Sequence, residues 1–139
     1  MKALLVLLVT SSVTAAEPAP SPLTVDIKPA ITTWHVRKPV AVVLTVENRS
    51  KTKQAIVVWL CSWGDNWTSN DADLGWDPWA CNKNFEKTET LEPGAAKHWT
   101  LSMYAMPTAK RGSHALRLGF TSGGGTTLWS NQVEITVEN

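Results

Sequence analysis

The chain has 139 residues, enough for one domain, and its 13 Lys and Arg against 12 Asp and Glu give a formal net charge of +1. This balance argues against a nucleic-acid-binding protein, which usually carries a concentrated basic excess. Hydrophobic residues make up 43% and charged residues 18% of the chain, so it can bury a core and is not expected to be disordered.

The N-terminal residues have the composition of a secretory signal peptide. Lys2 supplies a positive charge, an apolar run covers 3–9, and Ala15 and Ala16 offer small residues for cleavage. The apolar run is too short to span a bilayer, so we expect no membrane span in the mature chain. We therefore predict a signal peptide over 1–16 and a secreted or periplasmic protein. A buried N-terminal helix is the alternative.

The predicted elements beyond the leader begin with a spacer over 17–22, whose sequence E-P-A-P-S-P favours an extended chain. Alternating apolar and polar residues between turn residues then predict one domain over 23–139 with seven strands and no helix. Seven short strands separated by turns are typical of an immunoglobulin-like β-sandwich, an all-β fold of antiparallel strands. The predicted strands span 23–28, 39–47, 55–62, 85–91, 97–103, 114–121 and 128–137.

The alternation also predicts which side chains face the core. In the third strand we expect Ile56, Val58 and Leu60 to point inward, so that Trp59 and Cys61 point outward. In the fifth strand Trp99, Leu101 and Met103 share one face, and in the sixth Leu116, Leu118 and Phe120 point inward. In the seventh strand the inward residues are Val133, Ile135 and Val137.

The chain has two cysteines, Cys61 and Cys81. In an oxidising compartment they are expected to pair, with a stabilisation of about 3 kcal/mol in the chain-entropy model. A two-cysteine metal site is the alternative, but it needs nearby histidines and none lies between the two. Because Cys61 lies on the third strand and Cys81 in the following loop, this disulfide would not bridge two sheets as the antibody disulfide does.

Three turn segments resemble those of bacterial immunoglobulin-like domains of the BsuPI proteinase-inhibitor type. They are T-V-E-N-R-S at 45–50, L-E-P-G-A at 91–95 and G-S-H-A-L-R-L at 112–118. The resemblance covers about residues 40–121 and concerns the scaffold. It implies the same sandwich fold, and it makes a secreted proteinase inhibitor one candidate function.

The insertion between the third and fourth strands, residues 62–84, is the most informative segment. A loop of this length without regular structure is usually functional in a compact domain. It holds four tryptophans and four aspartates, and no cation occurs from Trp63 to Ala80. The predicted ligand-binding residues are Trp63, Asp65, Trp67, Asp71, Asp73, Trp76, Asp77 and Trp79.

Two interpretations of the insertion remain open. In the first, it folds over the outer face of the third strand and its tryptophans form a small second core with Trp59. In the second, one or two tryptophans stay available to a ligand. Tryptophan faces beside carboxylates and amides suit a glycan, and they equally suit a protein hot spot. We predict a non-catalytic binding module that contacts a glycan or a protein through 63–79.

Other chemistry is less well supported by the sequence. Calcium could bind the aspartates, but the segment from Asp71 to Gly75 does not match the EF-hand loop. A copper site would combine His98 and His114 with Met103 and Met106, although the two histidines are expected in different sheets. No catalytic motif occurs, so we expect no enzyme, no catalytic residues and no cofactor.

Overall fold

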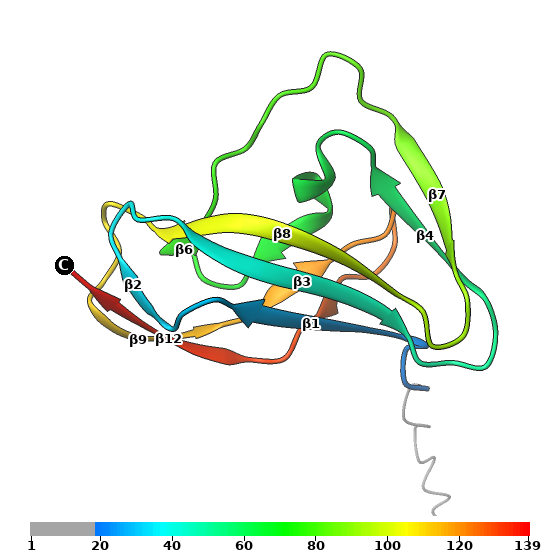
Figure 1. Ribbon diagram of the computed structural model, residues 1–139, viewed down its shortest axis with the longest axis horizontal. Helices are drawn as coiled ribbons and strands as arrows, with labels where there is room; N and C mark the ends of the chain where they lie inside the picture. Colours follow the sequence, from blue (N-terminus) through cyan, green and yellow to red (C-terminus); the bar gives the residue numbers. More distant parts are fainter. Residues whose placement is uncertain (1–18) are drawn as a thin grey trace, which may run out of the picture.

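The computed structural model describes residues 19–139, which form an all-β sandwich built mainly from antiparallel strand pairs (Figure 1). The predicted signal peptide, 1–16, lies outside the described residues, as do the first two residues of the predicted spacer. Residues 19–22 are exposed and lead directly into the first strand. Within 19–139, no helix has the length and apolar character needed to cross a membrane.

One layer of the sandwich is a four-stranded sheet whose central strands carry the clearest alternation in the sequence. Val40, Val42, Leu44 and Val46 are buried, and the residues between them are exposed or half-buried. In spatial order the strands of this sheet are β1 (Leu23–Pro29), β3 (Val40–Asn48), β8 (Ala96–Ala105) and β6 (Leu74–Gly75).

The other layer is divided into three smaller sheets. The first has β12 (Val133–Glu138) at its centre, paired in parallel with β2 (Thr33–His35) and antiparallel with β9 (Gly112–Leu116). The second has the order β11 (Leu128–Trp129), β10 (Leu118–Phe120), β5 (Trp67–Ser69), and the third pairs β4 (Gln54–Trp59) with β7 (Glu86–Leu91). The core between the layers contains the fully buried side chains of Trp34, Leu44, Ile56, Met103, Leu116, Phe120 and Ile135.

Asparagine side chains join the pieces of the sandwich where strand pairing stops. The buried Asn66 amide donates to Val57 O at 3.1 Å and Thr121 O at 2.9 Å, and its Oδ1 accepts from Trp59 N at 2.9 Å. The Asn66 side chain therefore links β4 to the end of β10 by hydrogen bonds, at a place where the two strands do not pair directly. Asn131 does the same at β1, where its Oδ1 accepts from Ile27 N at 2.8 Å.

Each of the seven predicted strands is present, but two of them are divided. The predicted strand 114–121 becomes β9 and β10 because Arg117 leaves the ladder, and its N–H donates to Asn70 Oδ1 at 2.7 Å. The predicted strand 128–137 likewise becomes β11 and β12. The predicted all-β fold with a Cys61–Cys81 disulfide is confirmed.

The expectation of an unstructured insertion is wrong. The insertion contains the 3-10 helix η1 (Trp63–Asn66) followed by β5 and β6, and the last two pair with β10 and β8. The inward orientation predicted for Leu60 is also wrong, because β4 ends at Trp59 and leaves Leu60 48% exposed. Strand β2 was not predicted, since three residues carry too little alternation.

Candidate functional site

A groove lies between β8 and the insertion. After β6 the chain leaves the sheet as residues 76–85, here called the arch, which passes above β8 to reach β7 (Figure 1). The groove has a volume of about 730 Å³, a size typical of ligand sites. Its lining residues are Arg37, Pro39, Trp63, Trp76, Asp77, Trp79, Thr100, Leu101, Ser102, Tyr104 and Pro107.

The aromatic wall of the groove is fixed by contacts among the tryptophans. The Trp63 ring meets the Trp79 ring edge-on with centroids 5.1 Å apart, and it lies 6.2 Å from the Trp99 ring of β8. The Trp79 indole donates to Cys61 O at 2.8 Å. Gly64 allows this packing, because a Cβ at that position would lie 2.4 Å from the Trp79 ring. The wall is therefore preorganised, and Trp79 remains 36% exposed.

The disulfide closes the segment that carries this wall. Cys61 and Cys81 are joined with their Cα atoms 6.0 Å apart and 20 residues apart in sequence. Trp63, Trp76, Asp77 and Trp79 all lie within the closed loop. The cross-link therefore limits the conformational freedom of the aromatic wall.

The polar end of the groove contains Asp77, Tyr104 and Arg37. The Tyr104 hydroxyl donates to Asp77 Oδ1. This hydrogen bond raises the pKa of Tyr104, desolvation and the Asp77 charge add to the rise, and the charge of Arg37 opposes it. Arg37 has a φ of 59°, which is uncommon for a residue other than glycine, and its N–H donates to Ala105 O at 3.0 Å. Unusual backbone conformations of this kind cluster at functional sites.

Four of the eight predicted ligand-binding residues line the groove, and four lie elsewhere. The structure brings together Trp63, Trp76, Asp77 and Trp79. Trp67 instead lies in the core at 5% exposure, with its ring centroid 5.7 Å from Trp99 and 5.2 Å from Phe120. Asp65 accepts a hydrogen bond from the Ser62 hydroxyl at 2.6 Å, and the remaining two residues are Asp71 and Asp73.

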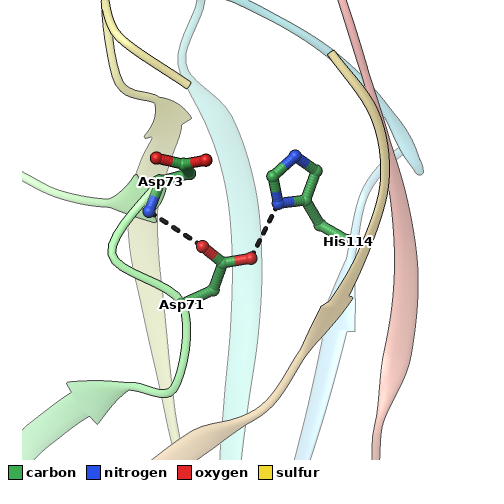
Figure 2. A group of neighbouring side chains, drawn as sticks. All are labelled: Asp71, Asp73 and His114. Carbon is green, nitrogen blue, oxygen red and sulfur yellow. Dashed lines mark hydrogen bonds and ion pairs between the residues drawn. The ribbon is translucent and has the colours of Figure 1, made fainter. Parts of the chain in front are cut away.

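Asp71 and Asp73 form a cluster with His114 of β9 (Figure 2). His114 Nδ1 lies 2.7 Å from Asp71 Oδ2, and its Nε2 lies 2.8 Å from Lys110 O. Lys110 O can only accept, and so can an ionised Asp71 carboxylate, so this geometry favours the charged imidazole that carries a proton on both nitrogens. Burial alone would lower the pKa of His114, but the hydrogen bonds to Asp71 and Lys110 and the charges of Asp71 and Asp73 outweigh it and raise the pKa.

The hydrogen bonds of this cluster leave few atoms for a metal ion. Asp71 Oδ1 accepts from Asp73 N at 2.8 Å, and Asp73 Oδ2 accepts from Lys110 N at 3.0 Å. Together with the His114 contact, these bonds use three of the four carboxylate oxygens and both ring nitrogens. The cluster therefore holds the insertion against β9 by hydrogen bonds. Its mixture of carboxylates and an imidazole does not fit the oxygen-rich shell that calcium prefers.

The residues of the copper site that was weighed as an alternative do not come together. His98 lies on β8 and His114 on β9, in different sheets as expected, and His98 Nδ1 is 3.0 Å from the Thr45 hydroxyl. Met103 is fully buried in the core. Within 19–139, the His114 cluster is the one group of three or more His, Cys, Asp or Glu side chains that lie close enough to share a metal ion.

Several residues of the groove were not predicted from the sequence. Thr100, Ser102 and Tyr104 form the outer face of β8, which the alternation of Trp99, Leu101 and Met103 could have indicated. Arg37 and Pro107 carried no such signal, because only the packing of distant segments brings them to the same groove.

Comparisons with known proteins give little further guidance. No family model matches the chain, and no curated protein matches its sequence. Among solved structures, the chain is similar to a beta-glucosidase from Listeria innocua in complex with gluconolactone, with a TM-score of 0.37 and 12% sequence identity. The match covers 84% of this chain and 16% of that one, so the chain spans less than a fifth of that protein's length. A likeness at this TM-score carries no argument about function.

Proposed function

We propose that the protein is a non-catalytic binding module of an oxidising, secreted or periplasmic compartment, which holds its ligand in the aromatic groove. The observation that carries the proposal is the convergence of Trp63, Trp76 and Trp79 on one open groove whose wall is fixed before binding. Rigid tryptophans with part of their surface exposed are typical of binding hot spots.

The polar groups of the groove support binding more than catalysis. Among the described residues that line it, Asp77 is the one carboxylate, and the Tyr104 hydroxyl already donates to it. A hydrolase of the two-carboxylate type needs a second acidic group at the reacting bond. The disulfide supports the proposed compartment, since such bonds persist where the environment is oxidising.

A matched pair of tryptophan variants tests the proposal. Trp76 lines the groove, whereas Trp129 is 41% exposed and lies outside it. Purified wild-type protein is first applied to arrayed glycans and arrayed peptides. Trp76→Ala is then expected to weaken binding to the retained probe by about 2 kcal/mol, some thirtyfold, and Trp129→Ala to leave it unchanged. Equal affinities for the wild type and a folded Trp76→Ala variant would contradict the proposal.

The alternative function, a secreted proteinase inhibitor, remains a prediction from the scaffold resemblance. It is tested by adding the protein to a panel of serine and cysteine proteases. Inhibition that persists in Trp76→Ala would place the activity outside the groove and favour the alternative.

A further inference from the structure

The floor of the groove is an open strand edge. Strand β8 pairs with β3 along one edge, from Val40 opposite Met103 to Glu47 opposite Ala96. Along the other edge, the partner strand β6 pairs only Leu74 with Ala105 and Gly75 with Tyr104. In the described part of the chain, no strand continues this pairing, because the arch leaves β8 at residue 76.

The hydrogen bonds at the end of β8 establish which backbone groups face this edge. Met106 N donates to Asp73 O at 2.8 Å on the β6 side, whereas Ala105 O accepts from Arg37 N at 3.0 Å on the β3 side. Successive residues of a strand direct their backbone groups to opposite edges. The N–H and C=O groups of Thr100 and Ser102 therefore point away from β3 and into the groove.

We infer that the ligand of the groove is an extended polypeptide segment that pairs with β8 at Thr100 and Ser102. This inference rests on the proposed function and names its ligand class. Unpaired backbone groups at a sheet edge form the template on which peptides add as a further strand. A glycan can use the tryptophans, but it has no repeating N–H and C=O groups that match those of a strand.

The walls of the groove indicate the side chains of this segment. A bound strand would direct alternate side chains to opposite faces. The apolar groups that line the groove include the rings of Trp63, Trp76 and Trp79, so side chains directed toward them are expected to be apolar. At the polar end, Arg37 and Asp77 contribute one positive and one negative charge. We therefore expect an electrically neutral segment with apolar residues at every second position.

Hydrogen exchange of the free protein tests the open edge without a ligand. The amides of Thr100 and Ser102 are expected to exchange at least about 100-fold faster than those of Leu101 and Met103, which pair with β3. Equal protection of all four amides would overturn the inference, because the edge would then already be paired.

Selected peptides test the pairing itself. Eight-residue peptides chosen from a random phage-displayed library are resynthesised with single N-methyl groups at successive positions. Methyl groups on the amides that face β8 are expected to weaken binding at least about tenfold, and those on the alternate amides to have little effect. The bound peptide is also expected to protect Thr100 and Ser102 from exchange. Weakening that does not alternate along the peptide would overturn the inference.

Two substitutions at one position provide a matched control. Ser102→Pro removes the N–H that faces the groove, and proline is tolerated at such an edge position. Ser102→Ala removes only the hydroxyl. We expect peptide binding to be at least about tenfold weaker in the folded Pro variant than in the Ala variant, because only the Pro variant lacks the N–H. A folded Pro variant with wild-type affinity would contradict the pairing.

The outcomes separate this inference from the proposed function. If arrayed glycans bind with dependence on Trp76 and no peptide is selected, the inference fails and the proposed function stands. If neither probe binds, both fail.

Discussion

The two halves of the insertion contrast in how they are held. The first half, 62–75, is incorporated into the sandwich through η1, β5 and β6, and it buries Asn66, Trp67 and Leu74. The second half departs from the sheet at residue 76, and its residues 77–80 are all exposed. The first half therefore completes the core and supplies Trp63 to the groove, while the second half supplies Trp76, Asp77 and Trp79 to the groove wall. One tryptophan-rich segment thus serves both purposes, and the boundary between them lies where strand pairing ends.

The largest effect on the free energy of unfolding is expected at Trp67. Its ring is buried against Trp99 and Phe120, so Trp67→Ala is expected to lower the free energy of unfolding by about 3–5 kcal/mol. The same change at Trp79, which is 36% exposed, should cost far less. Denaturant unfolding of both variants measures the difference. Similar losses would mean that the arch is as much a part of the core as β5.

A smaller effect is expected from removal of the disulfide. Replacing Cys61 and Cys81 together by Ser should lower the free energy of unfolding by about 3 kcal/mol in the chain-entropy model. The bond encloses the first half of the insertion and residues 76–80 of the arch. Because the arch has no strand partner, hydrogen exchange should rise in the arch and stay unchanged in β5. Faster exchange in β5 would show that the first half also depends on the cross-link.

The smallest effect is expected from the contact that ties the first half to β9. The folded state raises the pKa of His114, so its contribution to stability is complete below the unfolded pKa of about 6.5 and is lost as pH rises through the folded pKa. Thermal unfolding of the wild type from pH 5 to pH 9 should show this loss. The Asp71→Asn variant should lose most of that pH dependence, since the paired carboxylate is gone. If the pH dependence of stability were unchanged in this variant, groups other than the His114–Asp71 pair would be its cause.

The sequence predicted the strands well because alternation is a local signal. The buried positions of β3 and β8 follow directly from their residue types. The strands within the insertion were missed because β5 and β6 have only three and two residues, too few to alternate. Their pairing depends on the distant strands β10 and β8, which no local pattern reveals.

The candidate site was predicted only where a single segment supplies it. The insertion contributed Trp63, Trp76, Asp77 and Trp79, and composition alone pointed to these residues. The open edge of β8 depends on where β6 stops, which is a property of the folded chain. Composition also could not separate the groove tryptophans from Trp67. The Trp67 ring is buried by its contacts with Trp99 and Phe120, which are distant in sequence.

Two buried asparagines, Asn48 and Asn66, have a consequence for production of the protein. Asn66-Trp67-Thr68 and Asn48-Arg49-Ser50 both match the acceptor sequence for N-linked glycosylation. Both asparagines are buried, and the Asn48 amide donates to Thr52 O and Leu91 O at 2.8 and 2.9 Å. A sugar on either nitrogen has no room in this fold. A host that glycosylates its exported proteins would therefore modify only chains that have not folded, and each modified chain would be prevented from reaching this structure.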